Sequence, residues 1–112
     1  MTYEEIQTMI EEMGFENTYY QWPEGEAPDP PYILFYYPER SDFSADGINY
    51  QKITQLNIEF YSDQKDFDGE EVIETVLEEY GLFYTKEEQY IEQEHMYEIL
   101  YVMEVSINGS KS

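Results

Sequence analysis

The residues best spaced for metal chemistry lie in the segment 42–47, which reads DFSADG. Aspartate, a hydroxyl residue and aspartate at alternate positions, followed by glycine, form the first half of an EF-hand calcium loop. Such a loop also needs a bidentate glutamate at its twelfth position and a helix on each side. Counting from Asp42, the twelfth residue is Ile53, and both flanks read as strands. We therefore expect no EF-hand, and a weak surface calcium site made by Asp42, Ser44 and Asp46 is the alternative.

Groups suited to catalysis are sparse. His95 is the only histidine and there is no cysteine, which excludes thiolate chemistry and cysteine-ligated metal sites. No serine lies in a Gly-x-Ser-x-Gly setting, and no glycine-rich phosphate loop is present. Among 26 acidic residues some carboxylates are always paired, so such a pair does not indicate a catalytic site. We predict no catalytic residue, no bound metal, no cofactor and no enzymatic activity.

The charge of the chain limits its partners. The sequence contains 26 acidic residues and only five lysines and arginines, which gives a net charge of −21. Such a surface repels nucleic-acid phosphates and anionic membranes, so we expect neither direct nucleic-acid binding nor membrane association. Besides solubility, the charge fits contact with a basic protein, imitation of DNA, or a wall along which DNA slides without sticking.

The length of 112 residues suits one domain, and we predict a single unit over residues 1–112. Hydrophobic residues at 41% and aromatic residues at 18% argue against a disordered acidic tail. The N-terminal segment lacks the features of a signal peptide, and no apolar run is long enough to span a bilayer. We expect the protein in the cytoplasm of the cell that makes it.

Two amphipathic helices are expected. The first begins at a capping box, Thr2 with Glu5, and ends at Gly14. The second follows the acidic turn 62–69 and ends at Gly81. Each helix has an apolar stripe at helical spacing. The stripes are Tyr3, Ile6, Met9, Ile10 and Met13 in the first helix, and Val72, Ile73, Val76, Leu77 and Tyr80 in the second.

The other segments read as strands. They are 18–22, 32–37, about 48–62, the short pieces 82–85 and 89–93, and a long last strand after the turn at 94–95. The apolar run 32–37 is expected to be central and covered on both faces. Ile53 is out of phase with its neighbours, which indicates a bulge or a bend near Thr54. The order of elements predicts an α+β two-layer sandwich, with two amphipathic helices on one face of a mainly antiparallel sheet of about four to five strands.

The last strand carries apolar side chains on both faces. One face presents Tyr97, Ile99, Tyr101, Met103, Val105 and Ile107. The other presents Leu100 and Val102, a patch that so small a monomer should not expose. We expect burial against another copy, and a curled sheet that covers itself is the alternative. The candidate interface residues are Asp42, Phe43, Asp46, Leu100 and Val102.

Two blocks resemble a family of small structural proteins from the morphogenesis region of long-tailed bacteriophages and prophages of Gram-positive bacteria. They are PYILFYYPERSDFSADGINYQKITQLNI from Pro31, and the segment from Ile58 to Val105. The marks are the apolar strand opened by Pro31 and Tyr32, the Tyr-Gln-Lys strand at 50–52, and the closing Glu-x-x-Tyr-x-Ile-x-Tyr-x-Met-Glu strand at 94–104. The chain is most similar to the tail-terminator, or head–tail joining, class.

That resemblance implies an α+β sandwich that closes into a ring, usually a hexamer. The ring would cap the tail tube, stop its polymerisation and contact the head connector. It implies no catalytic residues, and it places the protein in the host cytoplasm during assembly and then in the neck or tail of the virion. Two other roles stay open: an acidic DNA mimic that inhibits a DNA-binding host protein, and an acidic adaptor for a basic protein.

Overall fold

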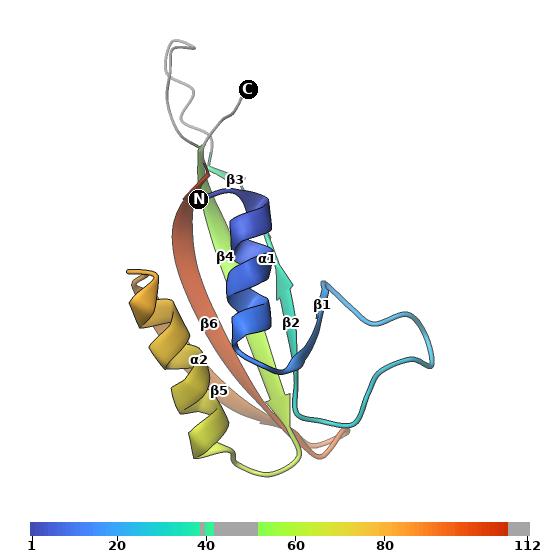
Figure 1. Cartoon of the computed structure of the whole chain (residues 1–112). Helices are drawn as coiled ribbons and strands as arrows, with labels where there is room; N and C mark the ends of the chain where they lie inside the picture. Colours follow the sequence, from blue (N-terminus) through green and yellow to red (C-terminus); the bar gives the residue numbers. More distant parts are fainter. Residues whose placement is uncertain (39, 42–51, 108–112) are drawn as a thin grey trace.

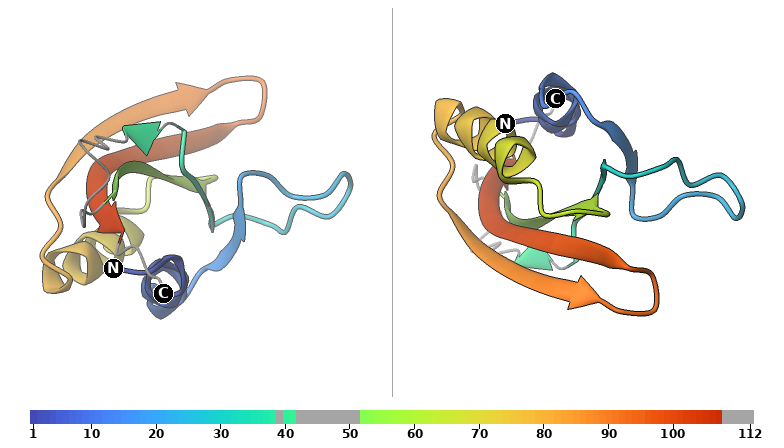
Figure 2. Two further views of the ribbon diagram at one scale, coloured as in Figure 1. Left: turned by 90° about the horizontal axis from the view of Figure 1, so that it is seen from above. Right: turned by 90° about the horizontal axis from the view of Figure 1, so that it is seen from below.

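Two helices and six strands make up the computed structural model, which describes residues 1–38, 40–41 and 52–107 (Figure 1). In chain order they are α1 (Tyr3–Glu12), β1 (Glu16–Tyr19), β2 (Tyr32–Tyr36), β3 (Arg40–Ser41), β4 (Lys52–Ser62), α2 (Phe67–Glu79), β5 (Tyr84–Ile91) and β6 (Met96–Ile107). Both helices lie on the same side of one curved sheet (Figure 2). The predicted α+β fold is therefore confirmed.

The strands of the sheet follow the order β1-β2-β4-β6-β5, and the short β3 also pairs with β4. Neighbours are antiparallel except for β1 and β2, which run parallel. β2 is an interior strand, but β4 takes the middle place. Leu34 and Tyr36 of β2 are only half-buried on the side away from the helices. The prediction that β2 is covered on both faces is thus wrong, because the described residues place no second layer over that side.

Helix boundaries follow local capping. The Thr2 hydroxyl accepts a hydrogen bond from the Glu5 backbone N–H at 3.0 Å, and the Glu5 carboxylate accepts one from the Thr2 N–H at 2.9 Å. The Asp66 side chain accepts from the Gly69 N–H at 2.8 Å at the start of α2. Gly14, after α1, has φ +85°, a conformation that glycine adopts without strain. The predicted capping box is confirmed.

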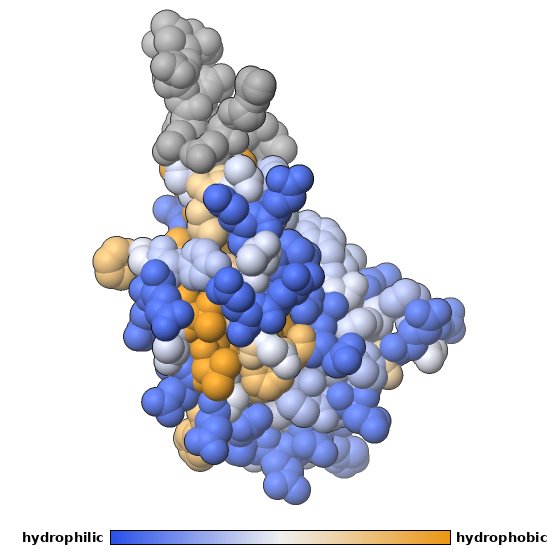
Figure 3. Space-filling view, in the orientation of Figure 1, coloured by the Kyte–Doolittle hydropathy of each residue, from blue (hydrophilic) through white to orange (hydrophobic). Residues whose placement is uncertain are grey.

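The core fills the space between the helices and the inner face of the sheet. The buried residues of β2, β4 and β6 on that face are Ile33, Phe35, Leu56, Ile58, Phe60, Ile99, Tyr101, Met103, Val105 and Ile107. The helices contribute Ile6, Met9, Ile10, Met13, Ile73, Val76 and Leu77. Tyr3 and Val72, both expected in the stripes, are exposed. Tyr3 packs its ring against Tyr37 near the surface, and apolar surface appears in the region between the two helices (Figure 3).

The pairing of β4 with β6 is unbroken from Lys52 opposite Ile107 to Ser62 opposite Tyr97. The bulge predicted near Thr54 is therefore absent. Ile53 is out of phase because its side chain belongs to the other face, in the same alternation. The two short pieces expected before the last strand form one strand, β5, which pairs with β6 from Tyr84 to Ile91.

Candidate interaction surface

The side of the sheet that carries no helix is here called the outer face (Figure 2). Because side chains alternate along a strand, the register fixes which residues share this face. Three neighbouring rows cross β2, β4, β6 and β5 in that order. They are Tyr32–Tyr61–Glu98–Gln89, Leu34–Glu59–Leu100–Glu87, and Tyr36–Asn57–Val102–Thr85. The outer face is therefore a mixture of acidic, amide, aromatic and aliphatic side chains.

Hydrogen bonds connect the polar side chains of this face across strands. The Tyr36 hydroxyl donates to Glu59 at 2.9 Å and accepts from the Asn57 amide at 3.3 Å. The Gln55 amide donates to the Asn57 oxygen at 3.0 Å. Asn57 is 7% exposed even though it lies on the outer face. These contacts order the side chains, although no other element in the described part of the chain covers them.

Tyr61 lies between two carboxylates. Its hydroxyl oxygen is 2.7 Å from a Glu59 oxygen and 3.2 Å from a Glu98 oxygen. The Gln89 amide donates to the other Glu98 oxygen. Burial raises the pKa of Tyr61, and the hydrogen bond and negative charge of Glu59, together with Glu98, raise it further. The phenol thus stays protonated and acts as a donor.

Two hollows open along β6. One of about 210 Å³ is lined by Leu100 together with Glu98 and residues of β5. The other, of about 470 Å³, is lined by Val102 together with Gln55 and the segment that enters β5. Phe83 borders this second hollow and is 93% exposed. An aromatic side chain this exposed is rare in a folded domain and is suited to contact with a partner.

The loop from β1 to β2 reaches the margin of the outer face. It projects beyond the sheet in Figure 1. The Trp22 ring lies 5.6 Å from the Tyr32 ring, and the Tyr20 ring lies 5.8 Å from the Tyr36 ring, measured between centroids. The start of this loop is thus continuous with the aromatic edge of the outer face.

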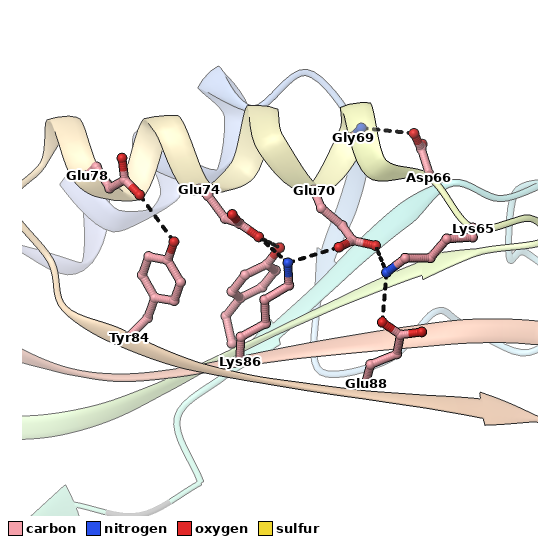
Figure 4. Close-up of polar contacts among 10 residues, drawn as sticks. Lys65, Asp66, Gly69, Glu70, Glu74, Glu78, Tyr84, Lys86 and Glu88 are labelled. Carbon is pink, nitrogen blue, oxygen red and sulfur yellow. Dashed lines mark hydrogen bonds and ion pairs between the residues drawn. The ribbon is translucent and has the colours of Figure 1, made fainter.

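Both lysines whose side chains are described lie on the inner side (Figure 4). Lys65 pairs with Glu70 and with Glu88, the latter at 2.7 Å. Lys86 pairs with Glu70 at 3.0 Å and with Glu74 at 2.6 Å. Desolvation lowers the pKa of each lysine, but the hydrogen bonds and charges of these glutamates outweigh it and leave the pKa raised. Each ammonium group is therefore paired with carboxylates on the inner side of the sheet.

Leu100 and Val102 lie on the outer face and are half-buried, one beside each hollow. Asp42, Phe43 and Asp46, with the rest of the DFSADG segment, lie outside the described residues.

Sequence reasoning did not single out Glu59, Tyr61 and Glu98. Their alternation with core residues indicated only that they face away from the helices. Their mutual contact depends on the register of β4 against β6, which places Tyr61 opposite Glu98.

Within the described residues, no three histidine, aspartate or glutamate side chains are grouped to hold a metal ion. In the same part of the chain, no helix has the length and apolar character needed to cross a membrane. His95 is exposed in the turn between β5 and β6.

No model of a known protein family matches the sequence, and no curated protein is significantly similar to it. Among solved structures, a chain of one described as the virion of a native gene transfer agent particle matches with a TM-score of 0.60. The fold occurs in a virion. The match covers 96% of this chain and 91% of the virion chain, at 13% sequence identity. At that identity the likeness concerns the fold, and it extends over nearly all of both chains.

Proposed function

We propose that this protein is a structural component of a phage-like virion and acts in its assembly. The observation that carries the proposal is the fold shared with a gene transfer agent virion chain over 96% of the present chain. The resemblance of the segments 31–58 and 58–105 to phage morphogenesis proteins supports the same role. A third support is the outer face, an ordered and partly apolar surface that no other element among the described residues covers.

Within this role, the protein acts as a tail terminator or head–tail joining protein. Copies form a ring, hexameric as in the family it resembles, which caps the tail tube and meets the head connector. The outer face and the adjoining loops make the contacts with neighbouring proteins, and Leu100 and Val102 belong to that contact surface. Asp42, Phe43 and Asp46 are proposed as further contacts. The charge of −21 lets DNA pass the ring without adhesion.

The test replaces Leu100 and Val102 together by glutamate and measures folding and particle assembly. Both side chains are half-buried on the outer face, outside the core cluster, so the variant is expected to fold. Tails are expected to lose length control or fail to join heads. Val72→Glu is the control, because Val72 is 42% exposed on α2 and away from the outer face. A folded double variant that gives normal tails would refute the proposal.

A DNA mimic is the second candidate, favoured by the net charge of −21. A mimic would displace duplex DNA from a basic nuclease at physiological salt. The assembly role predicts no displacement, so a competition assay separates the two.

A further inference from the structure

Acidic and aliphatic side chains alternate in the middle row of the outer face. Leu34 pairs with Glu59, Glu59 with Leu100, and Leu100 with Glu87. Directly opposed side chains on neighbouring strands lie about 5 Å apart at Cβ. The row therefore presents a carboxylate on each side of Leu100, and an aliphatic side chain on each side of Glu59.

The carboxylates of Glu59 and Glu98 retain capacity for hydrogen bonds. Tyr61 lies within hydrogen-bond distance of both, yet a hydroxyl group has one hydrogen and can donate to only one of them at a time. The donors Tyr36 and Gln89 fix the two carboxylates in place without supplying positive charge. Neither described lysine pairs with them, since both are bound to Glu70 and its neighbours. The pair is thus an ordered acceptor that suits a cation from outside.

A second copy of this chain is a poor source of that cation. The strand register places four charged side chains of β4, β5 and β6 on the outer face. All four are glutamates: Glu59, Glu87, Glu98 and Glu104. Two such faces in contact would oppose like charges, which costs several kcal/mol across an interface. Of the five basic residues in the sequence, Lys65 and Lys86 are already paired internally. Charge complementarity therefore favours a different, basic protein.

We propose that the outer face binds a different protein through an extended segment that carries arginine or lysine and apolar residues in turn at every second position, so that both kinds of side chain point to the same side. This inference rests on the proposed function and names the kind of partner its contact surface takes. An arginine fits best, because its planar guanidinium can bond Glu59 and Glu98 together while its aliphatic stem packs on Leu100. The apolar side chain two positions along the segment lies on the same side as this arginine and enters the hollow at Val102.

The test uses a short synthetic peptide with arginine and leucine in turn at every second position and serine between them. Binding is measured by calorimetry at about 0.15 M salt, where distant charges are screened. The variant Glu59→Gln/Glu98→Gln keeps the size and one acceptor oxygen of each side chain. We expect it to bind the peptide about tenfold more weakly than the native protein, because charged hydrogen bonds are lost. The control Glu71→Gln/Glu79→Gln changes the net charge equally on exposed positions of α2. The control should stay within about twofold of the native protein.

A second measurement needs no variant. Changes in amide chemical shifts on addition of the peptide are expected on β4, β5 and β6 of the native protein. A peptide with glycine in place of each leucine and the same arginines should bind more weakly. Equal loss in the two glutamine variants, shifts centred on the helices, or no binding would each overturn the inference. It would also be overturned if Leu100→Glu dissociated a ring of copies yet left peptide binding intact. That outcome leaves the proposed function standing, whereas normal tails in the Leu100 and Val102 double variant would refute the function without changing the peptide result.

Discussion

Glu70 should be the acidic residue whose neutralisation harms the fold. In a chain of net charge −21, removing one negative charge usually relieves repulsion. Glu70 differs because its side chain is 4% exposed and holds both Lys65 and Lys86. Glu70→Gln removes a charge-assisted partner from each lysine, and its amide places a donor beside an ammonium. We expect this variant to be less stable than the native protein.

The magnitude follows from the exposure of the two lysines. A hydrogen bond to a charged group contributes about 1.5–3 kcal/mol when shielded from water. The Lys65 and Lys86 side chains are 21% and 38% exposed, so solvent screening reduces both contributions. Each lysine also keeps one other glutamate. We therefore expect a loss of about 2 kcal/mol, which lowers Tm by about 8 °C in a domain of this size.

Urea and thermal unfolding followed by circular dichroism measure this difference, with Glu71→Gln as the matched control. Glu71 is adjacent in sequence, exposed, and loses the same charge. It should be neutral or stabilising by up to about 0.5 kcal/mol. The loss of stability in Glu70→Gln should persist at about 0.5 M salt, because salt screens short, shielded contacts less than distant ones. If the two variants have the same stability, the ion pairs of Glu70 with Lys65 and Lys86 give no net stabilisation and the reasoning fails.

Three further outcomes are expected. Gly69→Ala should destabilise by about 2 kcal/mol in urea despite alanine's higher helix propensity, because its Cβ would lie 2.8 Å from the Phe60 ring; a gain in stability would contradict this packing. Thr2→Ala should cost about 1 kcal/mol through loss of the cap, and Thr8→Ala, on the exposed side of α1, should not. Burial, and then Glu74, raise the pKa of Tyr101 in the fold, so its stabilising contribution is present below about pH 10 and decreases above it. This one tyrosine should lower the free energy of unfolding by up to about 1.4 kcal/mol per pH unit there, so the fall should be less steep in Tyr101→Phe by up to that amount.

The fold could largely be predicted because local signals agree with it. The capping box at Thr2 and the inward alternation from Ile99 to Ile107 can each be predicted from a short stretch of sequence. Both are confirmed. β5 was missed as one strand because Lys86, Glu87 and Glu88 have low strand propensity. Pairing with β6 overrides that preference, as tertiary context often does.

The contacts of the candidate surface were less accessible from the sequence. That Leu100 and Val102 face away from the core follows from alternation alone. The link between Glu59 and Glu98 requires the register of two strands far apart in the chain. The cluster at Glu70 likewise joins a turn, a helix and a strand. Interactions of this kind depend on tertiary structure, which no local pattern encodes.

The outer-face hydrogen bonds also bear on how the chain avoids misfolding. β6 reaches β5 through a tight local turn, but it must find β4 across the whole of α2 and β5. A slip of two residues between β4 and β6 would still oppose apolar side chains on the inner face, for example Leu56 with Tyr101. That slip would place Tyr61 opposite Met96, and a slip of two residues in the other direction would place it opposite Leu100, so either one separates Glu98 from its hydroxyl neighbour. The polar contacts of the outer face thus disfavour a register shift that the apolar inner face alone would allow. They help the folding chain to adopt a single register of β4 against β6.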